Sequence, residues 1–271
     1  MKMKKIICLA LAVAMMLTLS LSACAKSLSG TVSTNGSTSM EKVIGILSEQ
    51  FMEDNSDVTI TYDATGSGTG IEAVSNGTCD IGLASRALKD VETEKGLVAT
   101  TVALDGIAII VNADCPADDL TVEQISDIFT GKITSWEDFG GKGDIACIGR
   151  EAGSGTRGAF EELLKIEDQC AYAQELDSTG GVLAKVAATP GAIGYVSLDV
   201  VDDTVAAISL NGVAPTEENI VAGSYQLSRP FVMATMGDIA SQNDAVKTWF
   251  SYVQSDAGKA VITGLGLILP Q

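Results

Sequence analysis

The sequence predicts an α/β fold in which mainly parallel strands alternate with helices. Short apolar runs alternate along the chain with segments whose apolar residues recur at helical spacing, and this alternation is typical of parallel sheets covered by helices. No repeat of about 20 to 50 residues is visible, and no low-complexity linker divides the chain. If the chain forms two domains, ordered crossings must therefore join them.

The expected elements follow from local periodicity. Strands are expected where β-branched and apolar residues form short runs bounded by polar or small residues, and helices where apolar residues lie three and four positions apart. In chain order the expected elements are helix 41–51, strand 58–62, strand 81–84, strand 106–111, helix 122–129, strand 145–148, helix 160–166, helix 182–188, strand 192–196 and helix 244–254.

The first 23 residues predict an export signal. Three lysines form a basic start, and an apolar stretch follows from residue 6 to about residue 19. The sequence Leu-Ser-Ala-Cys at 21–24 then matches a bacterial lipobox, in which the cysteine becomes the new N-terminus and carries the lipid. The alternative is a membrane-spanning helix, but the apolar run is shorter than the roughly 20 residues that a span needs. We therefore expect lipidation of Cys24, a short leash at 24–28, and a location at the extracytoplasmic face of the cell membrane.

The charge and the residue types that are missing exclude several functions. A formal charge of −18 argues against nucleic acid or an anionic membrane surface as a partner, but not against a small anion, which responds to local donors. The sequence contains no histidine, which excludes a Ser-His-Asp triad and argues against zinc. We expect no metal site. The sequence leaves open whether the remaining cysteines are buried thiols or disulfides: Cys79, Cys115, Cys147 and Cys170.

Three expected helices begin with glycine and hydroxyl residues. The starts are Gly-Ser-Thr-Ser at 36–39, Gly-Ser-Gly-Thr-Gly at 66–70 and Gly-Ser-Gly-Thr at 153–156. Backbone N–H groups at a helix start lack partners and attract anions, and glycine allows close approach. The alternative is simple capping, and Thr38 with Glu41 and Thr69 with Glu72 have capping-box spacing. Each start offers more hydroxyls than a cap needs, so three together could surround a tetrahedral oxyanion.

Arginines accompany two of these patterns. Arg150 lies just before the third start, and its planar fork suits a bidentate oxyanion contact. Arg157 lies just inside the following helix, where it could simply point to solvent. Ser85 and Arg86 follow an expected strand, at the edge where α/β sheets bind ligands, although a solvated arginine explains Arg86 equally well.

Motifs spread over nearly the whole mature chain resemble one known family. They include Gly-Ser-Thr at 36–38, Gly-Ser-Gly at 66–68, DIGLASR at 80–86, DGIAIIVN at 105–112, IFTGKITSWEDF at 128–139, REAGSGTRGAF at 150–160 and PGAIGYV at 190–196. The sequence closely resembles the phosphate-binding lipoproteins of bacterial phosphate ABC transporters. This resemblance implies a two-lobe type II periplasmic-binding-protein fold that closes on phosphate at two hinge crossings. We expect lobe 1 at 29–105 plus 231–271, lobe 2 at 112–221, and crossings at 106–111 and 222–230.

The resemblance also implies a set of phosphate-binding residues. Besides the strand-end pair Ser85 and Arg86, the expected donors are Thr38, Ser39, Ser67, Arg150, Ser154, Gly155 and Thr156. This sequence departs from the family pattern at Arg86 and Ala152, where aspartates are expected. A hydrogen-bond acceptor must then come from elsewhere, and Asp105, at the start of the first crossing, is our candidate.

The function expected from this resemblance is capture of inorganic phosphate and its delivery to the permease subunits of an ABC importer, without catalysis or a cofactor. One alternative is a binding protein for another tetrahedral oxyanion, such as sulfate or molybdate. A more distant alternative is a secreted hydrolase that uses Ser67 or Ser154 as nucleophile.

Overall fold

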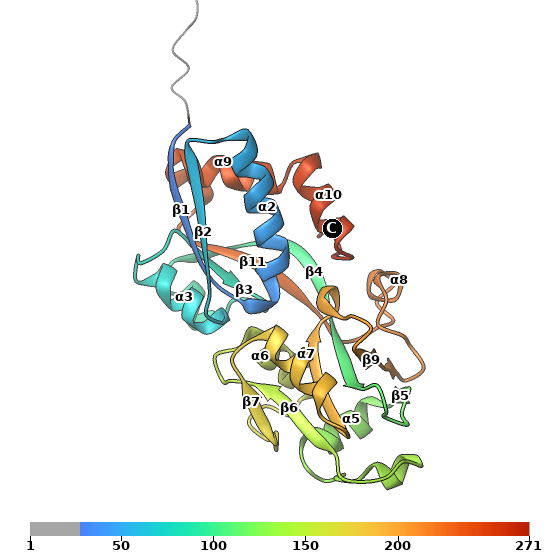
Figure 1. The fold of residues 1–271 in the computed structure, drawn as a ribbon. Coiled ribbons are helices and arrows are strands. Elements are labelled where there is room, and N and C mark those ends of the chain that lie inside the picture. Colours follow the sequence, from blue (N-terminus) through green and yellow to red (C-terminus); the bar gives the residue numbers. More distant parts are fainter. Residues whose placement is uncertain (1–27, 271) are drawn as a thin grey trace, which may run out of the picture.

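A computed structural model describes residues 28–270 of the chain (Figure 1). Its strands are β1 Gly30–Gly36, β2 Val58–Ala64, β3 Ile81–Ala84, β4 Leu97–Asn112, β5 Asp119–Leu120, β6 Ala146–Arg150, β7 Gln174–Leu176, β8 Ala192–Ser197, β9 Val205–Ala207, β10 Ser209–Leu210 and β11 Ser228–Met236. Its helices are α2 Glu41–Asp54, α3 Ser67–Ser75, α4 Asp90–Thr93, α5 Val122–Phe129, α6 Gly155–Leu164, α7 Thr179–Ala188, α8 Glu217–Val221, α9 Asp244–Val253 and α10 Asp256–Gly264. Short 3₁₀ turns are η1 Thr38–Met40, η2 Trp136–Phe139, η3 Leu198–Val200 and η4 Ile239–Ser241. The predicted signal and Cys24 lie outside the described residues.

One mixed sheet runs through the molecule. Its strand order is β2-β1-β3-β11-β4-β8-β6-β7, and β9 also pairs with β4. The strands β2, β1 and β3 of one half are parallel to one another, as are β8, β6 and β7 of the other half, and this agrees with the prediction. In the middle of the sheet, β11 runs antiparallel to β3 and to β4, and β4 runs antiparallel to β8. The 16-residue β4 pairs with β11 along its first part and with β8 along its last part, so a single strand passes from one half to the other (Figure 1).

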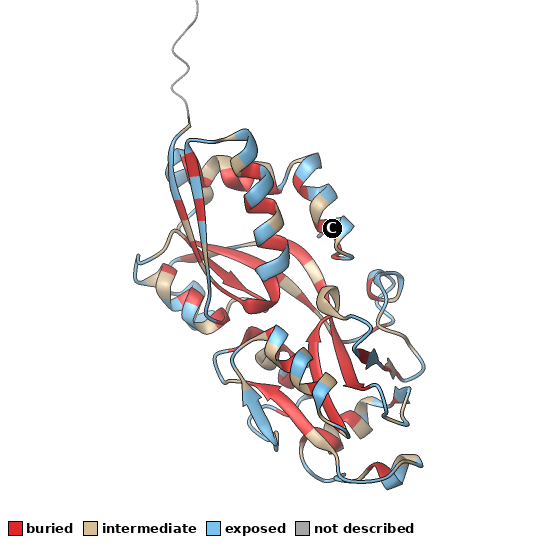
Figure 2. Ribbon diagram, in the orientation of Figure 1, coloured by how far each residue is buried: buried red, intermediate tan, exposed pale blue. Residues whose placement is uncertain are grey.

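Each half of the molecule has its own apolar core. One core packs β1, β2 and β3 against α2 and α9, and it draws on residues before Asp105 and after Pro230. A second set of buried residues, between Ile107 and Leu227, packs α5, α6 and α7 against β6 and β8. Figure 2 shows the buried strands of both halves between helices whose outer faces are exposed. Ile268, near the C-terminus, is an exception, because it packs with the second core and bonds to Leu104 through the backbone.

Element boundaries differ from the predictions at the helix starts and at the junction between the halves. The helix predicted at 160–166 begins at Gly155, because the Ser154 hydroxyl caps it by accepting a hydrogen bond from the backbone N–H of Arg157. The predicted strand 106–111 is the second part of the longer β4. None of the helices between residues 28 and 270 is long and apolar enough to cross a bilayer.

Candidate functional site

The first glycine-hydroxyl segment joins β1 to α2 and turns at Gly36. Its φ of +144° and a would-be Cβ only 2.1 Å from the carbonyl oxygen of Leu83 require glycine at this position. The alternative that Thr38 forms a capping box does not hold, because η1 precedes α2 and no side chain caps either element. The hydroxyls of Thr38 and Ser39 are instead buried and point toward the other half of the molecule.

The second segment lies against the first. The backbone N–H of Gly66 donates to the carbonyl of Gly36 at 2.8 Å, and α3 begins directly at Ser67. The capping alternative at Thr69 does not hold either, since Thr69 lies inside α3 and no side chain caps the helix. The Ser67 hydroxyl accepts a hydrogen bond from the backbone N–H of Ser85 at 3.1 Å, which brings the end of β3 into the same cluster.

The third segment, from the other half, faces the first two. A Cβ on Gly155 would lie 2.2 Å from the Ser67 hydroxyl oxygen and 2.8 Å from that of Ser85. The hydroxyl oxygens of Thr156 and Ser39 are 2.8 Å apart. The structure therefore brings all three predicted helix starts to one point between the halves.

A fourth helix start, which we did not predict, completes this hydroxyl cluster. The Thr179 hydroxyl oxygen lies 3.0 Å from that of Ser39 and 3.1 Å from that of Thr38. Thr179 opens α7 in the sequence Ser-Thr-Gly-Gly, which is the same glycine and hydroxyl composition as the other three starts. That composition is the signal that could have identified it.

The Arg150 guanidinium lies beside this cluster and is only 2% exposed. It donates to the Thr179 hydroxyl at 3.2 Å and to the backbone carbonyls of Leu176 and Asp177 at 3.1 and 3.0 Å. The neighbouring Glu151 carboxylate accepts from two of its nitrogens, at 3.0 and 3.2 Å. These contacts hold the planar group rigidly at the cluster, where its charge is little screened by water.

Asp105 is buried and linked to the cluster through Arg229, a residue that the sequence analysis missed and whose guanidinium donates to the Ser39 hydroxyl. Two nitrogens of Arg229 donate to the same carboxylate oxygen, Oδ2, at 2.9 and 3.1 Å. Burial raises the pKa of the Asp105 carboxyl to about 6; Arg229 opposes this rise and nearby Asp199 adds to it. The two N–H contacts from Arg229 favour the ionised carboxylate, which can accept hydrogen bonds.

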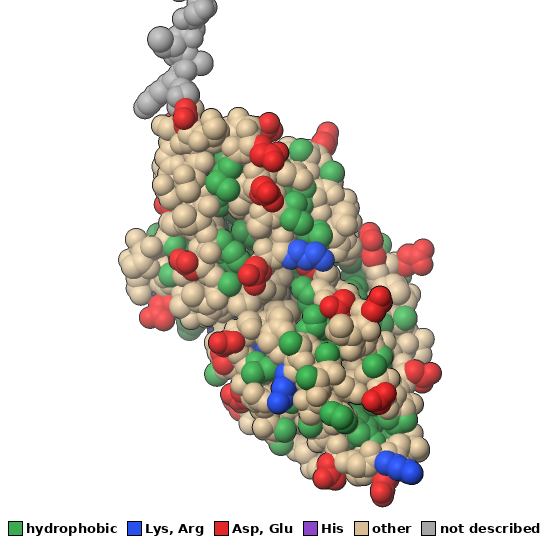
Figure 3. Space-filling model, viewed as in Figure 1, with side chains coloured by type: hydrophobic (Ala, Val, Ile, Leu, Met, Phe, Trp, Pro, Cys, Tyr) green, Lys and Arg blue, Asp and Glu red, His purple; other side chains and the backbone are tan. Residues whose placement is uncertain are grey.

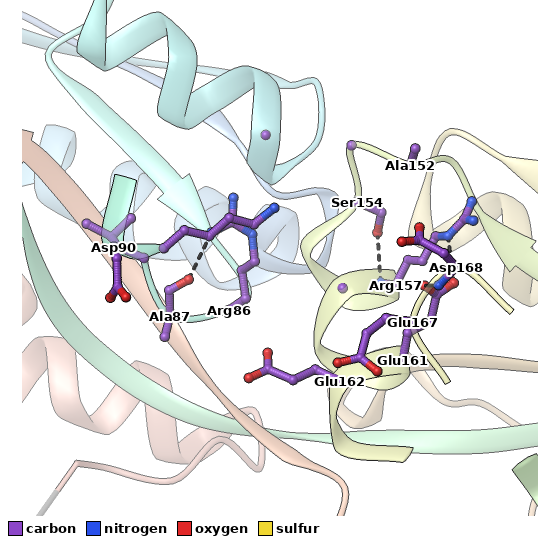
Figure 4. Close-up of a pocket in the computed structure, with 15 residues that line it drawn as sticks. Arg86, Ala87, Asp90, Ala152, Ser154, Arg157, Glu161, Glu162, Glu167 and Asp168 are labelled. Atoms are coloured by element: carbon purple, nitrogen blue, oxygen red, sulfur yellow. Dashed lines mark hydrogen bonds and ion pairs between the residues drawn. The ribbon is translucent and has the colours of Figure 1, made fainter. Parts of the chain in front are cut away.

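Arg86 does not join the cluster, which corrects our expectation for its side chain. Glu92 binds its guanidinium through two contacts of 2.8 Å, and a third N–H donates to the carbonyl of Ala87. Arg86 and Ala87 border a cavity of about 610 Å³ that opens beside the cluster. Figure 4 shows Arg86 on one wall and Ser154, Arg157 and Glu161 on the facing wall.

Arg157 also has fixed partners. It donates to Glu161 at 2.8 Å, to Glu175 at 2.9 Å and to the carbonyl of Arg150 at 3.0 Å. The alternative that its side chain simply points to solvent is therefore wrong. Its contacts support the strand end that carries Arg150.

The cluster has the donors and the charge that an oxyanion needs. Hydroxyls, helix N-termini and two guanidiniums converge there, while one buried carboxylate offers an acceptor. Acidic side chains are scattered over the visible surface of both halves (Figure 3), whereas two arginines, Arg150 and Arg229, are buried in the interior. Among residues 28–270, no group of three or more acidic or cysteine side chains is placed to hold a metal ion.

Comparison with known proteins identifies the same family that the sequence motifs resemble. The family model described as the PBP superfamily domain matches residues 23–257. The phosphate-binding protein PstS of Bacillus subtilis is 35% identical over 245 residues, which cover 89% of this chain and 81% of that protein.

Solved structures agree with this assignment. A Clostridium perfringens protein, described as a phosphate ABC transporter substrate-binding protein and crystallised with bound phosphate, is 37% identical with a TM-score of 0.85, over 89% of this chain and all (100%) of that one. A phosphate transport receptor from Vibrio cholerae is 32% identical with a TM-score of 0.74, over 89% of this chain and 100% of that one. The chain therefore belongs to the PBP superfamily, and within it to the PstS family of phosphate-binding proteins with the type II periplasmic-binding-protein fold.

Proposed function

We propose that this protein captures inorganic phosphate between its two halves and delivers it to the permease subunits of an ABC importer. The observation that carries this proposal is the convergence of glycine-hydroxyl helix starts from both halves with Arg150 in one buried cluster, which Arg229 links to Asp105. The family relationship supports phosphate as the anion. The proposed ligands are Thr38, Ser39, Ser67, Ser85, Asp105, Arg150, Ser154, Gly155, Thr156 and Thr179.

Calorimetric titration tests the choice of anion. We expect saturable 1:1 binding of phosphate and much weaker binding of sulfate and molybdate at the same pH and ionic strength. Asp105 is the physical reason, because phosphate keeps a proton near neutral pH that a carboxylate can accept, whereas sulfate has none. Equal or tighter binding of sulfate or molybdate would replace phosphate with one of these anions as the physiological ligand.

The cluster gives little support to a hydrolase. Within the described residues, the Ser67 hydroxyl forms hydrogen bonds only with Ser85, and the Ser154 hydroxyl serves as a helix cap. Neither contacts a group that could act as a general base, which a serine nucleophile requires. We therefore propose that the protein binds without catalysis, and turnover of a chromogenic phosphate ester by purified protein would contradict this.

The two halves are proposed to act as lobes that close on the ligand. Several contacts join them besides the hydroxyl cluster: the Gly68 N–H donates to the carbonyl of Gly153 at 2.9 Å, and the Lys42 ammonium donates to the carbonyl of Asp199 at 2.7 Å. We keep the predicted boundaries, 29–105 plus 231–271 and 112–221, with crossings at 106–111 and 222–230, as part of this proposal.

Phosphate should therefore make the protein more compact. A ligand that contacts both lobes favours the closed state through the contacts that it makes only there. Small-angle X-ray scattering should give a smaller radius of gyration at saturating phosphate than in its absence, with sodium chloride at equal ionic strength as the control. Superimposable curves would contradict closure around the anion.

Lipid attachment at Cys24 is a separate part of the proposal. It rests on the Leu-Ser-Ala-Cys sequence after a short apolar run. Cys24→Ser should move the protein from the membrane fraction to the soluble fraction and abolish its labelling by a fatty acid. Cys79→Ser, which changes a cysteine within the folded part, should change neither result. An unlabelled wild-type protein would contradict lipidation.

A further inference from the structure

Arg229 and Asp105 face each other where the chain passes between the two halves. They are directly opposite in the antiparallel ladder of β11 and β4, at the point where the first core ends and the second begins. Arg229 is 3% exposed and Asp105 is 1% exposed. An ion pair so far from water costs desolvation energy, and such pairs are often no more stabilising than apolar residues. The pair therefore invites an explanation in terms of function.

The Arg229 guanidinium is fixed from several directions. Besides its two contacts to Asp105, it donates to the carbonyl of Ser85 at 3.3 Å and to the Ser39 hydroxyl at 3.2 Å. The Phe231 ring lies beneath it, with 5.5 Å between the guanidinium carbon and the ring centre. A planar group held in this way presents its N–H fork in one orientation.

This orientation divides the two oxygens of Asp105 between different tasks. Both contacts from Arg229 go to Oδ2, and Oδ1 is buried without a hydrogen-bond partner among the described residues. The Ser197 hydroxyl lies close enough to lower the pKa of Asp105, but its hydrogen bond goes to Asp199 at 2.6 Å. A buried acceptor without a donor is unfavourable unless a ligand supplies one.

We infer that Arg229 is the positioning residue for anion selection: it engages Oδ2 of Asp105 and so holds Oδ1 ready to accept the proton of the bound phosphate. This inference rests on the proposed function. Arg229 acts here through Asp105. The Arg150 guanidinium attracts any oxyanion, whereas the Arg229–Asp105 pair favours an oxyanion that carries a proton over one that does not. Selection thus depends on the orientation of one carboxylate.

The inference makes an unusual prediction for Asp105→Asn. Arg229 can only donate, so it should turn the amide oxygen toward itself and leave the amide NH₂ in the place of Oδ1. An acceptor would then become a donor. Sulfate binding should strengthen, phosphate binding should weaken, and the phosphate-to-sulfate affinity ratio should fall to unity or below.

A second variant separates orientation from simple loss of charge. In Asp105→Asn/Arg229→Met no guanidinium orients the amide, so its oxygen can turn to the ligand and accept the proton. The affinity ratio should rise again by about tenfold relative to Asp105→Asn, which is the order expected for one hydrogen bond. The double variant also removes both buried charges. It should therefore fold at least as stably as the single variant, which leaves the buried Arg229 charge without a counter-ion.

Titration calorimetry with phosphate and sulfate on wild type and these variants, each checked by circular dichroism, provides the test. Arg229→Lys is the charge control: if Arg229 supplied only charge, Lys would keep the ratio, whereas a positioning role predicts a clear drop. Equal ratios in Asp105→Asn and the double variant, or a wild-type ratio in either Asp105→Asn or Arg229→Lys, would overturn the inference. Absence of phosphate binding by the wild type would instead contradict the proposed function itself.

Discussion

Asp105→Ala should collapse the preference for phosphate over sulfate toward unity. The other proposed ligands donate hydrogen bonds to an oxyanion, or can do so, and a donor does not distinguish a protonated from an unprotonated anion. Sites that pair a ligand O–H can reject an analogue that lacks it by about 10⁴-fold. With alanine, neither the acceptor for the phosphate proton nor the repulsion of sulfate remains.

Asp105→Ala also leaves the buried Arg229 without its partner, which should lower the free energy of unfolding by about 3–5 kcal/mol. Asp105→Ala/Arg229→Met removes both charges and should recover much of that loss. Thermal melting identifies the folded variants, and calorimetry with both anions at one pH and ionic strength gives the ratio. A ratio that stays at its wild-type value in a folded variant would show that Asp105 is not the acceptor, and Glu151 would be the next candidate.

Arg150→Ala should weaken the binding of phosphate and sulfate alike. Its guanidinium is buried beside the hydroxyl cluster and fixed by two backbone carbonyls. Removing one partner of a buried charge pair commonly costs about 2–5 kcal/mol in affinity. Arg150→Lys keeps the charge but not the planar fork, so its affinity should lie between those of wild type and Arg150→Ala.

Arg86→Ala is the matched control for Arg150. Arg86 also lies near the cavity between the halves, but Glu92 holds it away from the cluster. Substitutions outside a site usually change free energies by about 0.5 kcal/mol or less, so phosphate affinity should stay within about threefold of wild type. An unchanged affinity in folded Arg150→Ala would remove Arg150 from the site, and a large loss in Arg86→Ala would restore our original expectation for Arg86.

The sequence predicted those parts of the site that local patterns encode. Glycine and hydroxyl residues before a helical segment identified three helix starts, because the geometry of such a start depends on its own few residues. The same pattern at Thr179 was available but overlooked. The capping-box spacings at Thr38 and Thr69 did not give capping boxes, because capping depends on where the first helical turn begins. The Thr38 hydroxyl has its partners in the distant α7 instead.

Long-range pairing marks the limit of such predictions. Arg229 lies 124 residues from Asp105 in the sequence, and only the register of β11 on β4 brings them together. Nothing near Arg229 in the sequence distinguishes it from a surface arginine. Arg86 illustrates the converse, because its position at a strand end suggested a ligand, but Glu92, six residues away, satisfies it locally. Unlike local patterns, tertiary partners are set by the whole fold.

The unbroken β4 has a consequence for the timing of anion selection. In a rotation, the groups on the axis move least. If the two lobes close by rotating about the crossing strands β4 and β11, Asp105 and Arg229 lie on that axis and hardly move. An arriving anion would then meet the same carboxylate oxygen before and after the lobes close. Sulfate would already bind weakly to the open state and would dissociate quickly. The protein would thus spend little time closed on the wrong cargo, and the importer would seldom meet a falsely loaded carrier.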